Sequence, residues 1–284
     1  MKNFFLLICI FLPFFAKAQN LAVYALGGLA TYQGDLQSSR FAINQSNPAL
    51  GVGLLYNVSS KFLVRGGFTY GKIEGDDKKN TINKSTIPRN LKFASNITEG
   101  HIALEYNLFD MEERSLTPYV FAGAAVYHFN PYTNDAAGNK HFLQPLSTEG
   151  QGLVAYPSKK PYNLTQFAIP IGGGIKIAVT DNVQFAIEIG LRKLFTDYLD
   201  DVSSTYANRN LLLAARGSKA VELAFRGNEI APAANYPTVG DQRGNPKSKD
   251  WYYFSGVRLS KTLNFNNIGG NGRKSKTGCP GVVL

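Results

Sequence analysis

The sequence contains very little cysteine: two residues in 284, Cys9 and Cys279. Cys9 lies in an N-terminal segment that we expect to be removed, which leaves one thiol in the mature chain. One thiol cannot form an intramolecular disulfide, and it cannot supply the several thiolates of a structural zinc site. We therefore expect no disulfide framework, no cysteine-bound metal and no cofactor.

Long apolar runs are also missing, apart from one at the N-terminus. Phe4–Phe15 is preceded by Lys2 and followed by Ala16-Lys17-Ala18. A charged start, a short apolar segment and a small-x-small site indicate a secretory signal peptide, so we expect residues 1–18 to be cleaved after Ala18. No later segment reaches the length of a transmembrane helix, about 18 apolar residues. A lipoprotein with Cys9 at its cleavage point is the weaker alternative, because the apolar run continues past that residue.

Clustered basic residues are absent as well. The chain has 30 Lys and Arg against 20 Asp and Glu, a formal net charge of +10, but the positive residues are scattered and no basic block lies among aromatic residues. Nucleic acid is therefore not an expected partner. Contact with anionic lipid and lipopolysaccharide accounts for the charge more simply.

The motifs of common enzyme classes are missing too, including G-x-S-x-G, H-E-x-x-H and the phosphate-binding loop. His101 and Glu105 share one face of an expected strand. They lie four residues apart, about 13 Å along a strand, which is too far for a direct hydrogen bond. We expect no enzymatic activity, and an acyl-handling barrel enzyme is the least favoured alternative.

What the sequence does contain is alternation with a period of two. In 183–192 every odd position is large and apolar, and every even position is polar or small. This pattern predicts β-strands with one apolar face. Eight segments share this character: 21–33, 49–58, 62–74, 95–109, 116–129, 165–180, 183–195 and 251–263.

The length of the strands and the order of the connections favour a membrane barrel. Most expected strands reach the length that a tilted membrane strand needs, about 9–11 residues. Their connections alternate between short turns, such as 59–61 and 181–182, and long loops at 34–48, 75–94, 130–164 and 196–250. A soluble β-sandwich shows the same side-chain alternation but has no reason to keep this order.

We therefore predict an all-β fold, an eight-stranded antiparallel up-and-down transmembrane β-barrel in the bacterial outer membrane. Residues 19–265 form the barrel, with short periplasmic turns and long extracellular loops, and 266–284 form a periplasmic C-terminal tail. The segment Leu211 to Phe225 in the last loop predicts one short amphipathic helix at the barrel mouth. Aromatic residues at strand ends predict girdles at the two membrane interfaces, and these are Tyr32, Tyr56, Phe62, Tyr70, Phe109, Tyr119, Tyr127, Phe129, Phe195, Tyr198, Trp251, Tyr252, Tyr253 and Phe254.

Three groups of residues are candidate functional sites. The alternation places six charged residues inside the barrel: Arg65, Glu105, Lys176, Glu188, Arg192 and Arg258. An unpaired buried charge is costly, so we favour a salt-bridged plug over an ion path.

Asp197, Asp200 and Asp201 form an acidic cluster in the last loop. We favour a structural network with Arg192, Lys193, Arg209 or Arg243 over a calcium site, because the spacing fits no calcium loop. Cys279 in the tail is a candidate for an intermolecular disulfide, and an incidental free thiol is the equal alternative.

Several stretches resemble the PorG family, outer-membrane β-barrel components of the type IX secretion system of Bacteroidetes. The residues that carry the resemblance span nearly all of the mature chain, although 132–164 holds no motif that can be placed. They include Tyr32-Gln33-Gly34-Asp35-Leu36, Arg89-Asn90-Leu91-Lys92-Phe93, Thr117 to Gly123, Phe129-Asn130-Pro131, Phe167 to Lys176, Thr196 to Ser203, Arg243-Gly244-Asn245-Pro246, Lys249-Asp250-Trp251-Tyr252 and Cys279-Pro280. The resemblance implies a scaffold in protein export that anchors a periplasmic ring formed by the lipoprotein PorK and by PorN. The alternative function is a surface binding module, in which the loops at 130–164 and 196–250 hold a ligand or secreted cargo.

Overall fold

Eight long strands close into one antiparallel barrel in the computed structural model, which describes residues 21–39, 42–80, 82–111 and 113–263. The expected signal peptide, the tail and Cys279 lie outside the described residues. The strands are β1 Leu21–Gln33, β2 Ser46–Asn57, β3 Phe62–Asp76, β4 Lys92–Asn107, β5 Leu116–His128, β8 Thr165–Thr180, β9 Val183–Leu194 and β10 Trp251–Thr262. Each pairs with its neighbours along the chain, and β1 pairs with β10 to close the ring. The predicted fold is confirmed, and each of the eight strands begins and ends within three residues of its predicted limits.

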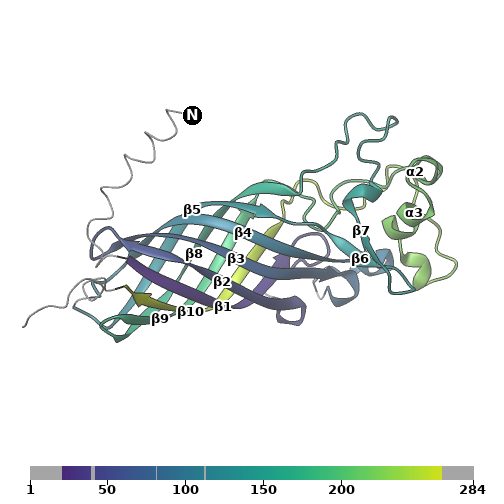
Figure 1. Ribbon diagram of the computed structural model, residues 1–284. Coiled ribbons are helices and arrows are strands. Elements are labelled where there is room, and N and C mark those ends of the chain that lie inside the picture. Colours follow the sequence, from purple (N-terminus) through teal and green to yellow (C-terminus); the bar gives the residue numbers. More distant parts are fainter. Residues whose placement is uncertain (1–20, 40–41, 81, 112, 264–284) are drawn as a thin grey trace, which may run out of the picture.

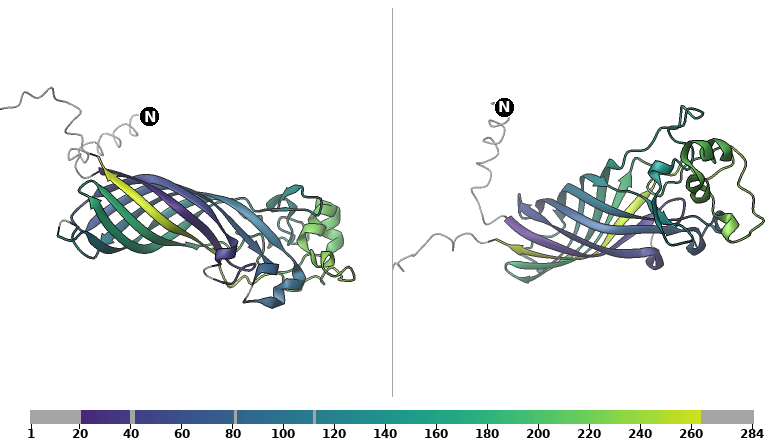
Figure 2. Two further views of the ribbon diagram at one scale, coloured as in Figure 1. Left: turned by 90° about the horizontal axis from the view of Figure 1, so that it is seen from below. Right: turned by 45° about the vertical axis from the view of Figure 1, so that its right-hand side comes forward.

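The connections divide by length between the two ends of the barrel (Figure 1). The turns at 58–61, 108–115 and 181–182 lie at the same end as the start of β1 and the close of β10. The four long connections lie at the opposite end and pack together. We call their described residues the cap: 34–39, 42–45, 77–80, 82–91, 129–164 and 195–250. The views in Figure 2 show the strands tilted about a common axis, with the cap at one end of the barrel.

Two short strands were not predicted. β6 Tyr132–Asn134 and β7 Lys140–Phe142 form a hairpin in the third long connection, and β6 continues the sheet at β4 through the pair Ala94 and Tyr132. Strands of three residues are too short to show a period of two. This explains why the two strands could not be predicted from the sequence.

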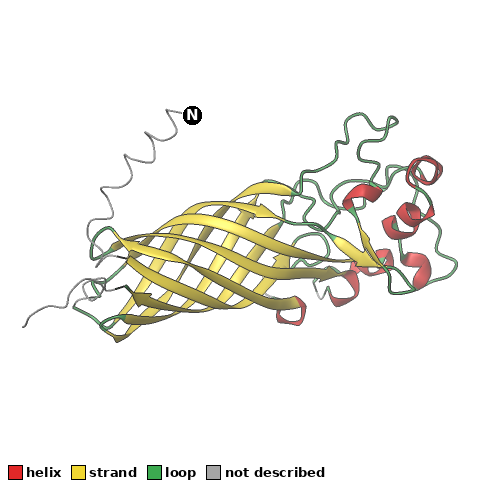
Figure 3. Cartoon of the chain, viewed as in Figure 1, coloured by secondary structure: helices red, strands yellow, loops and turns green. Residues whose placement is uncertain are grey.

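The helical segments among the described residues all lie in the cap (Figure 3). Two α-helices, α2 Arg209–Arg216 and α3 Ser218–Ala224, replace the single helix predicted for 211–225, so that prediction was wrong. Gly217 separates them with φ 84° and ψ 179°, a conformation that glycine adopts without steric cost. The remaining helical turns are the 3-10 segments η3 Ile43–Gln45, η4 Asp77–Lys79, η5 Lys84–Arg89, η6 Gln144–Leu146 and η7 Gly227–Glu229. No helix among the described residues is long and apolar enough to cross a membrane.

The outer wall of the barrel is apolar. Fifteen of its large side chains are 43% to 70% exposed: Leu50, Val52, Leu54, Phe68, Ile102, Leu104, Val120, Val126, Phe167, Ile171, Ile175, Ile187, Ile189, Val257 and Leu259. Side chains of the opposite parity point inward, and many of them are polar or charged. This is the reverse of a soluble barrel, and it is the arrangement that a hydrocarbon solvent requires. The barrel is therefore a membrane-spanning one.

The aromatic girdle was predicted only in part. Phe62, Tyr70, Phe109 and Phe195 are exposed on the outside. Tyr253 has the outward parity of Val257 and Leu259, yet it is buried. Six other members point inward and are buried, so assigning them to a lipid interface was wrong: Tyr32, Tyr119, Tyr127, Phe129, Tyr252 and Phe254. Most of these belong to a core that joins the upper barrel to the cap. Position at a strand end does not distinguish the two faces, whereas parity along the strand does.

Candidate functional site

The interior of the barrel holds a cluster of paired charges contributed by five strands. Arg65 on β3 binds Glu188 on β9 through two hydrogen bonds of 2.7 and 3.0 Å. Glu105 on β4 accepts hydrogen bonds from Arg258 on β10, at 2.8 and 3.3 Å, and from Lys176 on β8. The five side chains are at most 4% exposed. Bidentate arginine pairs of this kind fix both the geometry and the charge of the group.

Small residues opposite these charges make room for them. Glu188 pairs with Gly174 on β8 and with Gly256 on β10, while Ala186 lies between Lys176 and Arg258. An eight-stranded barrel is only wide enough to be filled by side chains. Alternation of long charged residues with glycine and alanine therefore lets the charged chains reach across the lumen and meet.

A second layer of charge lies nearer the cap. Arg192 on β9 donates to both oxygens of Glu99 on β4, with distances of 2.8 to 3.3 Å. The Tyr252 hydroxyl donates to Glu99 at 2.7 Å, and the His101 ring nitrogen Nδ1 lies 3.2 Å from the same carboxylate. The structure thus places Arg192 apart from the other five predicted lumen residues. Glu99 was missed by the sequence analysis, although it has the inward parity of Glu105 on the same strand.

The predicted acidic cluster is buried at the junction of barrel and cap. Asp197 accepts a hydrogen bond from the Ser203 hydroxyl at 2.7 Å, and Asp200 accepts one from the Tyr32 hydroxyl at 2.5 Å. Asp201 accepts from Thr148 and Tyr162. Each carboxylate therefore has its own set of partners. In the part of the chain that the structure describes, no group of acidic, histidine or cysteine side chains is arranged to hold a metal ion.

The predicted ion-pair partners of this cluster were only partly right. Among the described residues only Arg243 pairs with one of the three carboxylates, at 3.8 Å from Asp201, while Arg192 is engaged by Glu99. Burial raises the pKa of Asp197 to about 7 and, against the opposing charge of Arg243, the pKa of Asp201 to about 6. Burial also raises the pKa of Asp200 well above its ordinary value. The cluster therefore retains protons that free carboxylates release.

Two buried arginines join all four long connections. Arg89 binds both oxygens of Asp77 at 2.9 and 2.6 Å, and it donates to the main-chain oxygens of Asp35 and Arg243. Arg243 donates to Glu149 at 3.1 Å and to the Asp201 carbonyl at 2.5 Å. We call these contacts the cap network. Sequence reasoning named Arg243 only as a possible partner and missed Arg89, Asp77 and Glu149. Apart from the pair of Arg89 and Asp77, which lie 12 residues apart, the contacts of the network join residues 42 to 154 positions apart.

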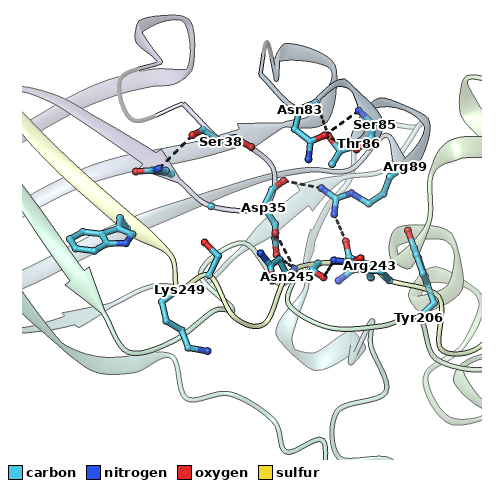
Figure 4. Close-up of a pocket in the computed structure, with 16 residues that line it drawn as sticks. Asp35, Ser38, Asn83, Ser85, Thr86, Arg89, Tyr206, Arg243, Asn245 and Lys249 are labelled. Carbon is cyan, nitrogen blue, oxygen red and sulfur yellow. Dashed lines mark hydrogen bonds between the residues drawn. The ribbon is translucent and has the colours of Figure 1, made fainter.

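A polar pocket of about 580 Å³ opens beside the cap network (Figure 4). Segments 33–38, 83–89 and 242–251 line it, together with Tyr206. The side chains that face it come from the first, second and fourth long connections, and from Trp251 at the start of β10. Most of the loop 130–164, which the sequence analysis proposed as a binding element, packs elsewhere in the cap.

Comparison with known families gives one match. A family model described as "Domain of unknown function (DUF6089)" matches residues 1–215. No curated protein matches the sequence.

Solved structures with a similar fold include three surface or outer-membrane proteins. Neisserial surface protein A is 10% identical with a TM-score of 0.40, and the match covers 86% of this chain and 97% of that protein. The outer membrane protein OprG from Pseudomonas aeruginosa is 10% identical with a TM-score of 0.39, covering 86% and 98%. Ail, the attachment invasion locus protein of Yersinia pestis, is 8% identical with a TM-score of 0.35, covering 85% and 99%. At TM-scores of this size the likeness carries no argument about function, and the barrel fold rests on the strand pairing described above.

Proposed function

The chain belongs to the family described as domain of unknown function DUF6089, and from this premise we propose that it is a non-conducting outer-membrane anchor of the type IX protein secretion system. In this role the barrel holds the periplasmic ring of PorK and PorN at the membrane. The membrane-spanning barrel and the expected signal peptide support the outer-membrane location. The PorG-like stretches of the sequence support the secretion system and the ring partners.

The observation that carries the anchor role is the closed interior. Arg65, Glu105, Lys176, Glu188 and Arg258 meet in the lumen with almost no exposure to solvent. A solute would have to break these pairs to pass, and each broken pair leaves an uncompensated buried charge. A barrel blocked in this way acts through its two ends. The end that carries the short turns, the start of β1 and the end of β10 is the one that faces the periplasm in this proposal.

Conductance tests the closed lumen directly. Purified protein in planar bilayers is expected to show no steady single-channel current, and Glu105→Gln with Lys176→Met is expected to show some. Steady wild-type channels would contradict a non-conducting anchor.

Cross-linking tests the ring. Native membranes treated with a short cross-linker and then subjected to affinity isolation of the barrel are expected to yield PorK and PorN. A deletion of 266–284 is expected to reduce that yield if the tail takes part. Efficient export of secretion-system cargo from a strain that lacks the barrel would refute the proposal.

The tail thiol gives a separate test. If Cys279 forms an intermolecular disulfide, the wild-type protein should give a high-mass band on a non-reducing gel, and Cys279→Ser should not. Identical bands with and without reductant would remove the disulfide and leave the anchor role standing.

A further inference from the structure

The pocket in the cap has the dimensions of a small-molecule site. Its volume of about 580 Å³ lies within the range of ligand pockets, about 300–1,000 Å³. It opens at the end of the barrel opposite the short turns, which is the extracellular end in the proposed orientation. A ligand here would not depend on the ring at the other end.

The strongest charges beside the pocket are already neutralised. Arg89 is bound on two sides by Asp77, and Arg243 is bound by Glu149, so neither guanidinium can serve an anion without losing a buried partner. Asp35 accepts hydrogen bonds from the Asn245 main-chain nitrogen at 3.1 and 2.9 Å. Lys249 is the exposed cation, and its amine donates to the Pro246 carbonyl at 3.1 Å. This arrangement does not favour a phosphate or a carboxylate as the ligand.

Neutral hydrogen-bonding groups make up most of the remaining lining (Figure 4). In the described residues, the Asn83 amide nitrogen, the Gln242 amide oxygen and the Ser248 hydroxyl form no hydrogen bond, and all three residues are exposed. Asn83 lies on the second long connection, and Gln242 and Ser248 lie on the fourth. Donors and acceptors placed in this way match a ligand with several hydroxyl groups.

One aromatic face completes the lining. Trp251 is half-buried at the barrel rim and borders the pocket. A sugar ring has a rim of hydroxyls and an apolar face of C–H groups, and an indole offers a large, rigid surface for such a face. Neutral amides, hydroxyls and one indole therefore suit a sugar better than an anion or an apolar molecule.

We propose that the cap pocket binds a neutral saccharide, with Asn83, Gln242 and Ser248 receiving its hydroxyls and Trp251 packing on a ring face. The saccharide is either a free oligosaccharide or the polysaccharide part of a lipopolysaccharide in the same leaflet. This binding function goes beyond the anchor role, and the two proposals are tested by separate experiments.

Trp251 also provides the measurement, because it is the only tryptophan in the sequence. The full-length protein in detergent micelles is titrated with four probes: intact lipopolysaccharide of the producing strain, the polysaccharide released from it by mild acid, maltotriose and inorganic phosphate. We expect a saturable change in Trp251 emission with at least one saccharide probe and none with phosphate. Calorimetry under the same conditions detects binding that leaves the emission unchanged.

The three saccharide probes distinguish the source. A response to released polysaccharide or maltotriose without one to intact lipopolysaccharide assigns a free saccharide. A response to intact lipopolysaccharide assigns the lipid-linked form.

Three variants locate the binding. Ser85→Phe fills the pocket mouth and is expected to weaken saccharide binding at least tenfold. Ser158→Phe, a serine equally exposed on the cap but outside the pocket, is expected to stay within twofold of wild type. Lys249→Ala is also expected to stay within twofold, since a neutral ligand does not need its charge.

Two results would overturn the proposal. Saturable phosphate binding that disappears in Lys249→Ala would replace the saccharide with an anion, and the absence of both the emission change and the calorimetric signal with every saccharide probe would remove the site.

Discussion

Gly34 follows β1, and the side chains of Tyr32 and Asp250 fill the space that a side chain at this position would need. A Cβ atom at this position would lie 2.1 Å from the Asp250 carboxylate and 2.1 Å from the Tyr32 hydroxyl. That hydroxyl is the donor that satisfies buried Asp200. Glycine at position 34 therefore leaves room for the Tyr32 hydroxyl, which donates to Asp200 in the acidic cluster. This explains why the Tyr32-Gln33-Gly34-Asp35 stretch has glycine as its third residue.

Gly34→Ala is expected to destabilise the cap by about 1–3 kcal/mol, the usual cost of forcing extra atoms into a packed site. Hydrogen exchange of cap amides in micelles measures the change. Gly27→Ala is the matched control, because its nearest neighbour would lie 4.0 Å from the new Cβ. Equal protection in both variants would show that the close contact relaxes freely.

Asp197 makes the cap sensitive to pH. Its pKa rises from 3.8 to about 7 on folding, and that of Asp201 rises to about 6, because both carboxyls are buried. The folded cap thus binds protons that the unfolded chain releases, and its stability falls as pH rises from about 4 to 7. Above about pH 7 this contribution is constant.

We expect the cap to unfold at lower denaturant concentration at pH 8 than at pH 5. Asp197→Asn should be more stable than wild type at pH 8 and should show a weaker dependence on pH, because the amide mimics the neutral acid. Asp181→Asn, on an exposed turn, controls for the loss of one charge. A wild-type cap that gains stability between pH 5 and pH 8 would contradict the protonated cluster.

Inward charges could be predicted from the sequence because strand parity alone decides which face a side chain takes. Glu105 and Arg258 needed no knowledge of their partners. The pocket and the cap network needed such knowledge. Arg89 and Arg243 lie in irregular loops without periodicity, and their contacts depend on how four separate connections pack. Nothing local in the sequence encodes that packing.

At the scale of elements, the two helices show how the cap holds together. Leu212 on α2 is fully buried among Leu153, Ala220 and Val221, whereas Leu211 beside it is 45% exposed. The sequence predicted helical character here but not the break. Gly217 ends α2 with a positive φ. A single glycine within a helical pattern is only a weak signal that a helix ends.

Leu212→Ala is expected to cost the cap about 2–5 kcal/mol, as for other buried leucines. Leu211→Ala should cost less than about 1 kcal/mol, in line with exposed substitutions. Limited proteolysis of the cap in micelles compares the two. Similar cleavage rates would mean that α2 and α3 contribute little to cap stability.

At the scale of the molecule, the lumen charges connect strands that are far apart around the ring. Glu105 on β4 binds partners on β8 and β10 and lies 3.6 Å from Arg65 on β3. These contacts cross the interior, in addition to the hydrogen bonds that run around the wall. The ion pairs in the lumen therefore form a second set of contacts between opposite sides of the barrel.

Glu105→Gln leaves buried cations without their main partner and is expected to destabilise the barrel by about 3–5 kcal/mol. Urea unfolding in lipid vesicles, followed by gel mobility of the folded form, measures this. Glu74→Gln is the control, since its pairs with Lys72 and Lys79 are partly exposed and such pairs contribute about 0–1 kcal/mol. Equal midpoints would show that the lumen pairs add nothing net to stability.

The pairing of β1 with β10 has a consequence for biogenesis. Twelve residues of each strand are in register along this contact, from Ala22 with Thr262 to Gln33 with Trp251. Before β10 pairs with β1, the sheet has two edge strands whose main-chain N–H and C=O groups lack partners. Such unpaired groups are costly in the hydrocarbon of a bilayer. The polypeptide therefore requires a chaperoned route to the bilayer. The cap must already lie on its own side of the membrane when β1 pairs with β10, because the closed barrel leaves no opening for it afterwards.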